Sequence, residues 1–330
     1  MQYVLGVDQG HTETRAAVCD IEGNIMSVGR AYGACHSVHG MNKAMGAIQV
    51  ACQSALARAG IGADEIAILY CGLTGADWPD EYALLRDNAV LLGLCERVQI
   101  KNDSIVALRG GTSADCGAIV IAGTGANCAI RSPRGEEFIY HFYHDHNLQG
   151  GIALGRRALN VIYRAETGRE PPTTLTLRVL DMFDLSSVDD LLRADVERCL
   201  SQNDTKHIAP LVFQAACEGD LVSCRILKAF GEGLAELVAA GLKRLEMTHL
   251  DVEIVLSGNI FKGPGTLVEE VLMANVHMIA PKARLVNARY EPVVGAVMLG
   301  IEVLGKKVDE RVKRNIEISS QELNLVRVEG

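Results

Sequence analysis

The chain has 330 residues, more than one compact core usually holds, so we expect two domains. With 48% hydrophobic and 22% charged residues it has the composition of an ordinary globular protein. The net charge is −9 and no run of Lys and Arg is present, which argues against a nucleic-acid partner. No apolar run is as long as a membrane span and the chain begins with a predicted strand, so we expect no membrane partner and a cytoplasmic location.

The spacing of apolar residues predicts two α/β halves joined at a Gly- and Ser-rich stretch, residues 109–115. The elements predicted for the first half are three antiparallel strands over 2–30, a helix over 40–59, strands over 66–72 and 96–102, and a helix over 80–93. The elements predicted for the second half are strands that restart at 116, helices over about 151–248 with the longest at 220–246, strands over 252–257 and 283–287, and helices near 265–275 and over 291–305. The last 25 residues, 306–330, are charged and weakly patterned and predict a peripheral strand or tail.

Two turns carry the strongest chemical signal. Residues 4–18 form a strand, the turn Asp8-Gln9-Gly10-His11-Thr12, and a second strand. A carboxylate on such a turn lies beside backbone N–H groups and hydroxyls, which suits the phosphates of a nucleotide and their Mg²⁺, although many such hairpins are turns without a ligand. A similar turn, Gly123-Thr124-Gly125-Ala126, follows another apolar strand. The pair favours phosphate binding and suggests two similar domains.

A third element places an acid between the two turns in the chain. The strand over 98–102 ends at Asp103, where a helix is predicted to begin. An Asp at such a place is usually a helix N-cap. A carboxylate at the carboxyl end of a strand is also where a general base would take the proton of an attacking hydroxyl.

These motifs resemble the superfamily of sugar kinases, heat-shock ATPases and actin, and within it the BadF/BadG/BcrA/BcrD ATPase group that includes N-acetylglucosamine kinases. The resemblance extends from Val4 to about Leu304, with its motifs in the order GVDQGHTETRAAV, LTGADWPDEYALL, KNDSIVAL, VIAGTGANCAI, GRRAL, AACEGD, VLSGNIF and EPVVGAVMLG. It implies an α/β fold of two duplicated ribonuclease H-like (actin-like ATPase) domains around a central cleft. We place these domains at 1–114 and 115–330, the second with a helical insertion.

The resemblance also implies an activity, namely ATP-dependent phosphorylation of a small hydroxylated substrate, with a hexose or an amino sugar expected. Asp103 would be the catalytic base and contact the substrate, and Asp8 would hold Mg²⁺. Nucleotide contacts would come from Gly10, His11, Thr12, Gly123, Thr124, Gly125, Ala126, Gly258 and Asn259. Asp77 would approach the acceptor, although an Asp before Trp-Pro also stabilises turns. A homodimer is compatible with this interpretation.

One segment departs from the pattern of amino-sugar kinases. Those proteins usually carry an aspartate that binds sugar hydroxyls, but Asn147 or Gln149 occupies its position here, depending on how the loop is aligned, unless Asp145 replaces it. Both amides bind hydroxyls without charge, so we expect weak activity on N-acetylglucosamine relative to the best substrate. Gln9 and His11 also replace common glycines in the first turn, and their bulk would narrow the approach of a phosphate.

Two other functions remain open on this pattern. Related ATPases activate acyl-CoA dehydratases through an iron–sulfur cluster held near the second turn, where Cys116 and Cys128 lie here. Both cysteines fall in apolar runs, and the ten cysteines contain no C-x-x-C pair, which favours buried thiols. A non-catalytic sugar sensor is the third function, and the lack of a helix-turn-helix segment before Met1 argues against it.

A histidine group, FIYHFYHDHN, suggests a metal site formed by His141, His144, Asp145 and His146. Alternation along an extended segment would place these side chains on opposite sides, so we expect no metal there.

Overall fold

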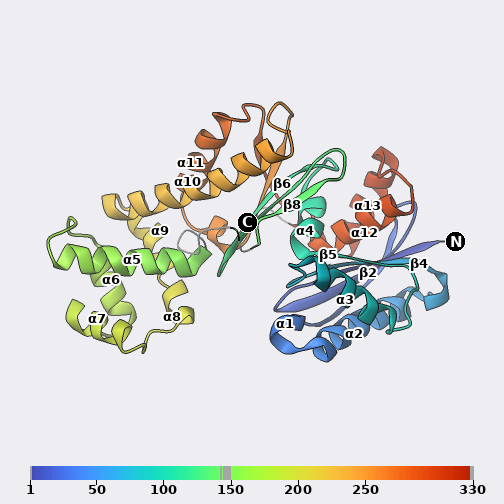
Figure 1. Cartoon of the computed structure of the whole chain (residues 1–330), viewed down its shortest axis with the longest axis horizontal. Coiled ribbons are helices and arrows are strands. Elements are labelled where there is room, and N and C mark those ends of the chain that lie inside the picture. The colour runs from blue at the N-terminus through green and yellow to red at the C-terminus, as the bar shows by residue number, and fades with distance from the viewer. Residues whose placement is uncertain (1, 142, 144–149, 328–330) are drawn as a thin grey trace. The chain divides into compact units, whose positions relative to one another are not determined.

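The computed structural model describes residues 2–141, 143 and 150–327. The chain divides into two compact units (Figure 1): unit 1 comprises Met1–Ile119, Pro133–Gly135 and Val286–Gly330, and unit 2 comprises Val120–Ser132 and Glu136–Leu285. This division differs from the expected domains 1–114 and 115–330, because α12 (Pro292–Val303) packs against strands of the first sheet.

Unit 1 is built on a five-stranded sheet with the strand order β3-β2-β1-β4-β5. Its strands are β1 (Tyr3–Gln9), β2 (Glu13–Asp20), β3 (Ile25–Tyr32), β4 (Ile66–Leu73) and β5 (Val98–Asn102). The first three strands are antiparallel, as the sequence predicted, and β1, β4 and β5 are parallel to one another. The carboxyl ends of β1, β4 and β5 therefore lie at one edge of the sheet.

Alternate residues of β1 pack against helices on opposite faces of this sheet. Leu5 and Val7 share a core with Ile48 of α2 (Met41–Ala59). Gly6 faces α12 (Pro292–Val303) so closely that a Cβ would lie 2.8 Å from the Val297 nitrogen. The remaining helices of unit 1 are α1 (His36–His39), α3 (Pro79–Val90), α4 (Asp103–Gly111) and α13 (Glu310–Glu322), together with the short turn η1 (Ala63–Glu65).

Unit 2 carries the second sheet, with the strand order β10-β9-β6-β7-β8. Its strands are β6 (Gly117–Ala122), β7 (Ala126–Arg131), β8 (Glu137–Ile139), β9 (Glu253–Ser257) and β10 (Arg284–Asn287), and its helices are α5 (Gly150–Glu166), α6 (Leu175–Met182), α7 (Val188–Val196), α8 (Gln202–Lys206), α9 (Ala209–Cys217), α10 (Leu221–Arg244), η3 (Asn259–Lys262) and α11 (Leu267–His277). The long helix α10 packs against β7, where Gly241 leaves space for Ile130. The predicted run of helices between the strands is confirmed.

The prediction of a strand or tail over the last 25 residues was wrong. Residues Glu310–Glu322 form α13, which begins at an Asp309 side chain that accepts hydrogen bonds from the Arg311 and Val312 amides. Val312 and Ile316, four residues apart, supply the buried side of this helix. Two apolar positions among many charged residues form a stripe that is too narrow to predict a helix from the sequence alone.

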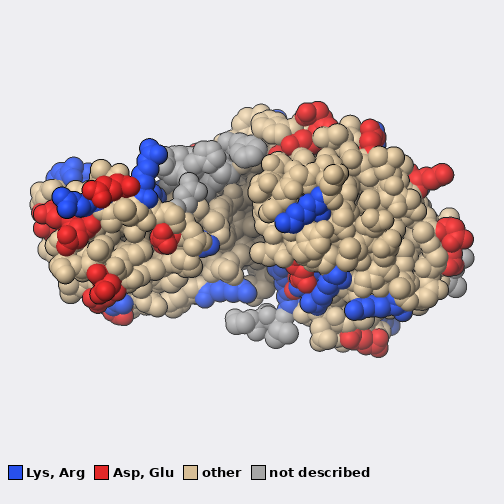
Figure 2. Space-filling model, turned by 90° about the horizontal axis from the view of Figure 1, so that it is seen from below, with Lys and Arg blue, Asp and Glu red and all other residues tan. Residues whose placement is uncertain are grey.

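The described residues include no helix long and apolar enough to cross a membrane. On the face drawn in Figure 2, Lys and Arg lie in small groups among Asp and Glu and do not merge into one basic band.

Candidate functional site

The β1–β2 turn of unit 1 is held by its own backbone. The Gly10 amide donates to the Glu13 oxygen over 2.9 Å, and the oxygens of Gly10 and Thr12 accept from the amides of Ala34 and Gly33. A Cβ at Gly33 would lie 2.4 Å from the His11 oxygen, so glycine is required where the chain passes under the turn. His11 and Thr12 are exposed and are therefore the part of the turn that a phosphate could reach.

Asp8 lies at the carboxyl end of β1 in a dense group of charges. Burial and the negative charge of Asp103 raise the pKa of Asp8 to about 7, Glu291 adds to this effect, and Arg15 and Arg327 oppose it. Arg15 faces Asp8 across the β1–β2 pair and donates to an oxygen of Glu291 over 2.9 Å. Two acids are thus close enough to repel one another, which a bound cation would relieve.

Asp103 is not the N-cap of α4. Asn102 has that role, because its Oδ1 accepts from the Ser104 amide over 3.0 Å. Strand register explains why Asp103 lies near Asp8: Gln9 of β1 and Asn102 of β5 both align with Leu73 of β4 between them. The carboxylate of Asp103 therefore begins a helix, beside Asp8, without being needed to cap it.

Asp77 lies beside this edge of the sheet, in the segment that follows β4. Its Oδ1 accepts from Asn102 Nδ2 over 3.0 Å, and the same amide group donates to the Ala76 oxygen. Asn102 therefore connects Asp77 to the first turn of α4. Glu81 also stabilises this segment, because its carboxylate accepts from the amides of both Asp77 and Trp78 over 2.8 Å.

His36 is a candidate site residue that the sequence did not reveal. Its side chain is 9% exposed, and its Nε2 lies 3.3 Å from Glu81 Oε1. Its Nδ1 is buried and has no hydrogen-bond partner. His36 also lies next to Gly75, in the segment that leads to Asp77. Buried polar atoms are nearly always paired, so the unpaired ring nitrogen makes His36 a candidate for contact with a ligand or a bound water.

The concern about bulk in the first turn applies to only one of its two residues. Gln9 is buried, and its Nε2 donates to the Ala44 oxygen in α2 over 2.9 Å. Its side chain therefore lies inside the unit and does not narrow the phosphate approach. His11 is exposed, with its ring centroid 6.3 Å from that of His39.

The β6–β7 turn of unit 2 is open where the first turn is crowded. Its Gly123 amide donates to the Gly125 oxygen over 2.8 Å, and a Cβ at either glycine would meet no atom of the described residues within 4 Å. The turn rests on the start of α5, because the Gly151 amide donates to the Gly123 oxygen over 2.7 Å. Thr124 and Gly125 are exposed, and Ala126 begins β7. Bare backbone facing open space beside a helix N-terminus suits a phosphate.

Gly258 joins this turn from the end of β9. Its φ is +110°, and a Cβ there would lie 2.1 Å from the Ala122 oxygen, so only glycine fits against the strand that leads into the turn. Asn259, the next residue, is exposed and begins η3. The structure therefore brings together the two nucleotide motifs predicted in unit 2.

The residues that the sequence predicted as sugar or metal contacts in the loop after β8 lie mostly outside the described residues. Asn147, Gln149, Asp145, His144 and His146 all lie there, and His141 is the only member of the histidine group that is described. Among the residues that the structure describes, no three His, Cys, Asp or Glu side chains could together hold a metal ion.

The cysteines are all free thiols, and most are at least partly buried, as expected. Cys199 and Cys217 are exposed, which corrects the expectation of uniform burial: Cys199 lies in the segment after α7, and Cys217 is the last residue of α9. Cys128 is fully buried, and burial raises its pKa far above the usual range. A thiol that resists ionisation is a poor cluster ligand, which weakens the activator hypothesis.

Comparison with solved structures places the fold. A provisionally assigned N-acetylglucosamine kinase from Chromobacterium violaceum matches with a TM-score of 0.63 and 22% identity, over 91% of this chain and 99% of that one. The chain is thus a two-domain α/β protein of the actin-like ATPase and sugar-kinase fold.

Sequence comparison gives the family. The model of the BadF/BadG/BcrA/BcrD ATPase family matches residues 5–300, so the chain belongs to that family. An N-acetylmuramic acid/N-acetylglucosamine kinase of Clostridium acetobutylicum is 24% identical over 91% of this chain and 98% of its own length. An N-acetyl-D-glucosamine kinase of Dictyostelium discoideum is 26% identical over 90% of this chain and 97% of its own.

Proposed function

We propose that the protein is an ATP-dependent kinase that phosphorylates a hydroxyl group of a hexose or an amino sugar. The observation that carries the proposal is the acid pair at the edge of the first sheet, where Asp103 begins α4 and acts electrostatically on Asp8. The family match and the kinase relatives support the same activity.

Asp103 is the proposed general base. Its carboxylate takes the proton from the sugar hydroxyl as the hydroxyl oxygen bonds to the γ-phosphorus of ATP. The bond from that phosphorus to the bridging oxygen breaks, and ADP leaves with the electron pair. Asn102 holds the first turn of α4 and thereby fixes the position of this carboxylate.

Asp8 is the proposed ligand of Mg²⁺, directly or through water. A single buried carboxylate that is repelled by a second acid fits a cation that takes its other ligands from phosphates and water, as Mg²⁺ commonly does. The ion supplies charge neutralisation to the phosphates when bound. Arg15 limits the excess of negative charge around Asp8 before any cation binds.

Unit 2 is the proposed holder of the nucleotide. The open backbone at Gly123, Thr124, Gly125 and Ala126 suits the phosphates, and Gly258 with Asn259 suits the adenosine. In unit 1 the exposed His11 and Thr12, with Gly10 shaping their turn, are the proposed phosphate contacts.

The acceptor is proposed to bind near Asp77 and His36. Asp77 offers carboxylate oxygens, and His36 offers the unpaired Nδ1, which suits a hydroxyl or amide group of a sugar. Asn147 and Gln149 are kept as proposed contacts to a sugar hydroxyl. A cytoplasmic location and a homodimer also remain proposals.

A panel of sugars tests the activity. We expect ADP release from ATP that depends on one or more of glucosamine, N-acetylglucosamine, N-acetylmuramate, glucose and mannose, with N-acetylglucosamine weaker than the best substrate. Slow ATP hydrolysis that no sugar stimulates would favour the dehydratase activator. Sugar binding without ATP turnover would favour a sensor.

A further inference from the structure

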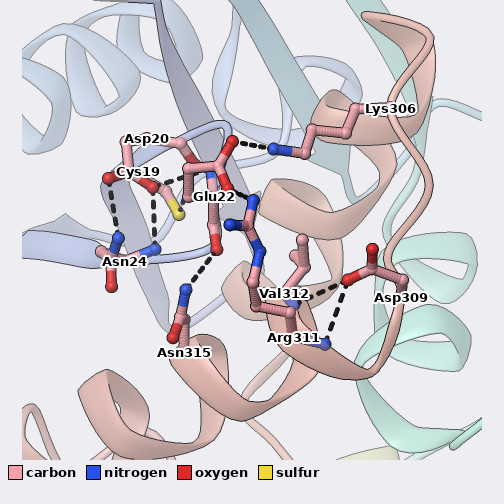
Figure 3. Close-up of polar contacts among 9 residues, drawn as sticks. All are labelled: Cys19, Asp20, Glu22, Asn24, Lys306, Asp309, Arg311, Val312 and Asn315. Carbon is pink, nitrogen blue, oxygen red and sulfur yellow. Dashed lines mark hydrogen bonds and ion pairs between the residues drawn. The ribbon is translucent and has the colours of Figure 1, made fainter.

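Residues 301–327, which lie beyond the family match, pack within unit 1 and reach the charged residues around Asp8. That match ends at residue 300, yet α13 and the residues after it pack within unit 1. Figure 3 shows how α13 is anchored on the β2–β3 turn. Glu22 of the turn forms ion pairs with Lys306 and Arg311, and its backbone oxygen accepts from Asn315 Nδ2 over 2.8 Å. A Cβ at Gly23 would lie 2.6 Å from the Val312 oxygen, so the turn and the helix fit closely.

After α13 the chain runs beside the segment that leads into α12. Val326 forms an isolated antiparallel bridge with Tyr290. The Glu291 amide donates to the Leu325 oxygen over 2.8 Å, and the Arg327 amide donates to the Arg289 oxygen over 3.0 Å. The backbone from Arg289 to the Glu291 amide is thereby tied to the last described residues of the chain.

Two guanidinium groups share one carboxylate oxygen at this point. Arg15 lies 2.9 Å and Arg327 lies 3.3 Å from Glu291 Oε2. Arg15 faces Asp8 across the first strand pair and is also held by Glu13 over 2.7 Å. The ion network therefore runs from the C-terminal segment through Glu291 to the residue opposite Asp8.

We propose that Arg327 is a positioning residue of the phosphate-binding turn, which acts through Glu291 on Arg15. Arg327 offsets part of the negative charge of Glu291. Glu291 therefore cancels less of the positive potential that Arg15 produces at the turn beside Asp8. Without Arg327, Glu291 is paired with Arg15 alone, and the surroundings of the turn become more negative. Both guanidinium groups act electrostatically on Asp8 in the direction that this requires. The inference rests on the proposed function, because it concerns affinity for a nucleotide.

Nucleotide binding by the full chain tests this role without any sugar turnover. We expect Arg327→Met to weaken the binding of Mg·AMP-PNP by about two- to fivefold, as for a partly exposed ion pair, and Arg327→Lys to restore most of it. The matched control is Arg311→Met, which removes an arginine of α13 that contacts Glu22 rather than Glu291. That variant should bind the nucleotide as the wild type does, and thermal unfolding should show that all the variants are folded.

A double-mutant cycle separates a local role from a structural one. In the Glu291→Gln background, the effect of Arg327→Met on nucleotide affinity should fall to the small part that the direct action of Arg327 on Asp8 supplies. An effect of undiminished size in that background, a failure to recover with lysine, or an equal effect of Arg311→Met would overturn the inference. Loss of Mg·AMP-PNP binding by the wild type would overturn the proposed function, and the inference with it.

Discussion

The two turns that we propose as phosphate sites, β1–β2 in unit 1 and β6–β7 in unit 2, differ in what surrounds them. In unit 1, the polar residues near the turn already have partners. Gln9 is hydrogen-bonded to Ala44, Asn102 is hydrogen-bonded to Asp77, and Arg15 forms an ion pair with Glu291. In unit 2, a Cβ at Gly123 or Gly125 would meet no atom within 4 Å in the part of the chain that the structure describes. The contrast suggests a division of labour. A reacting acid must be held in place, whereas a nucleotide cradle needs bare backbone that the ligand itself fills.

Removing the base should give the largest effect and the sharpest test of this division. Asp103→Asn should lower kcat by about 10²–10⁴-fold, because the hydroxyl proton then has no acceptor. Binding of Mg·AMP-PNP should stay within a few-fold of the wild-type value, since the substitution removes no proposed contact to the nucleotide or to Mg²⁺ and changes only the repulsion that Asp103 exerts on Asp8. Asp80→Asn, the same change at an exposed position in α3, is the control. Steady-state kinetics and calorimetry measure both, and unchanged turnover in Asp103→Asn would remove that residue from the mechanism.

The motifs that could be predicted from the sequence are those that depend on local pattern. Strand alternation identified β1 to β3, and the Gly-Thr turn identified the open hairpin of unit 2, because a phosphate cradle made of backbone is encoded by adjacent residues. Gly258 followed from its own motif, and the structure adds the reason, which is its approach to Ala122.

Contacts between distant segments could not be predicted in this way. His36 meets Glu81 only because the chain after β3 passes beside the loop after β4. The sequence alone could not show that Asn102 rather than Asp103 caps α4, because Asn and Asp suit an N-cap equally well. The backbone conformation, which determines where the helix begins, selects Asn102. Arg327 reaches Glu291 because the segment around Val326 pairs with the segment around Tyr290, and no periodic pattern in the sequence predicts this pairing.

Two glycines of unit 2 should separate an open position from a packed one. Gly258→Ala should weaken nucleotide binding by about 10²-fold and lower the melting temperature, because its Cβ would displace the strand before the turn. Gly125→Ala should weaken binding and leave the melting temperature unchanged, since its Cβ would occupy only space meant for the ligand. Equal loss of stability in both variants would show that the β6–β7 turn is not an open cradle.

The smallest effect that we expect is on acceptor binding. Two substitutions of His36 test it, because each places an amide group near the position of one of the two ring nitrogens. The amide nitrogen of glutamine can reach the position of Nε2 as a donor, and the amide oxygen of asparagine can reach the position of Nδ1 as an acceptor. His36→Gln should therefore keep the contact with Glu81 but lose the group at Nδ1, and raise the KM for the sugar about tenfold, as expected for one lost buried hydrogen bond. His36→Asn should raise it less, although its contact with Glu81 is lost and its melting temperature falls. The KM for ATP should stay constant in both variants. If the KM for the sugar instead follows the melting temperature, so that asparagine is the worse replacement, then His36 supports the fold through Glu81 and does not contact the acceptor.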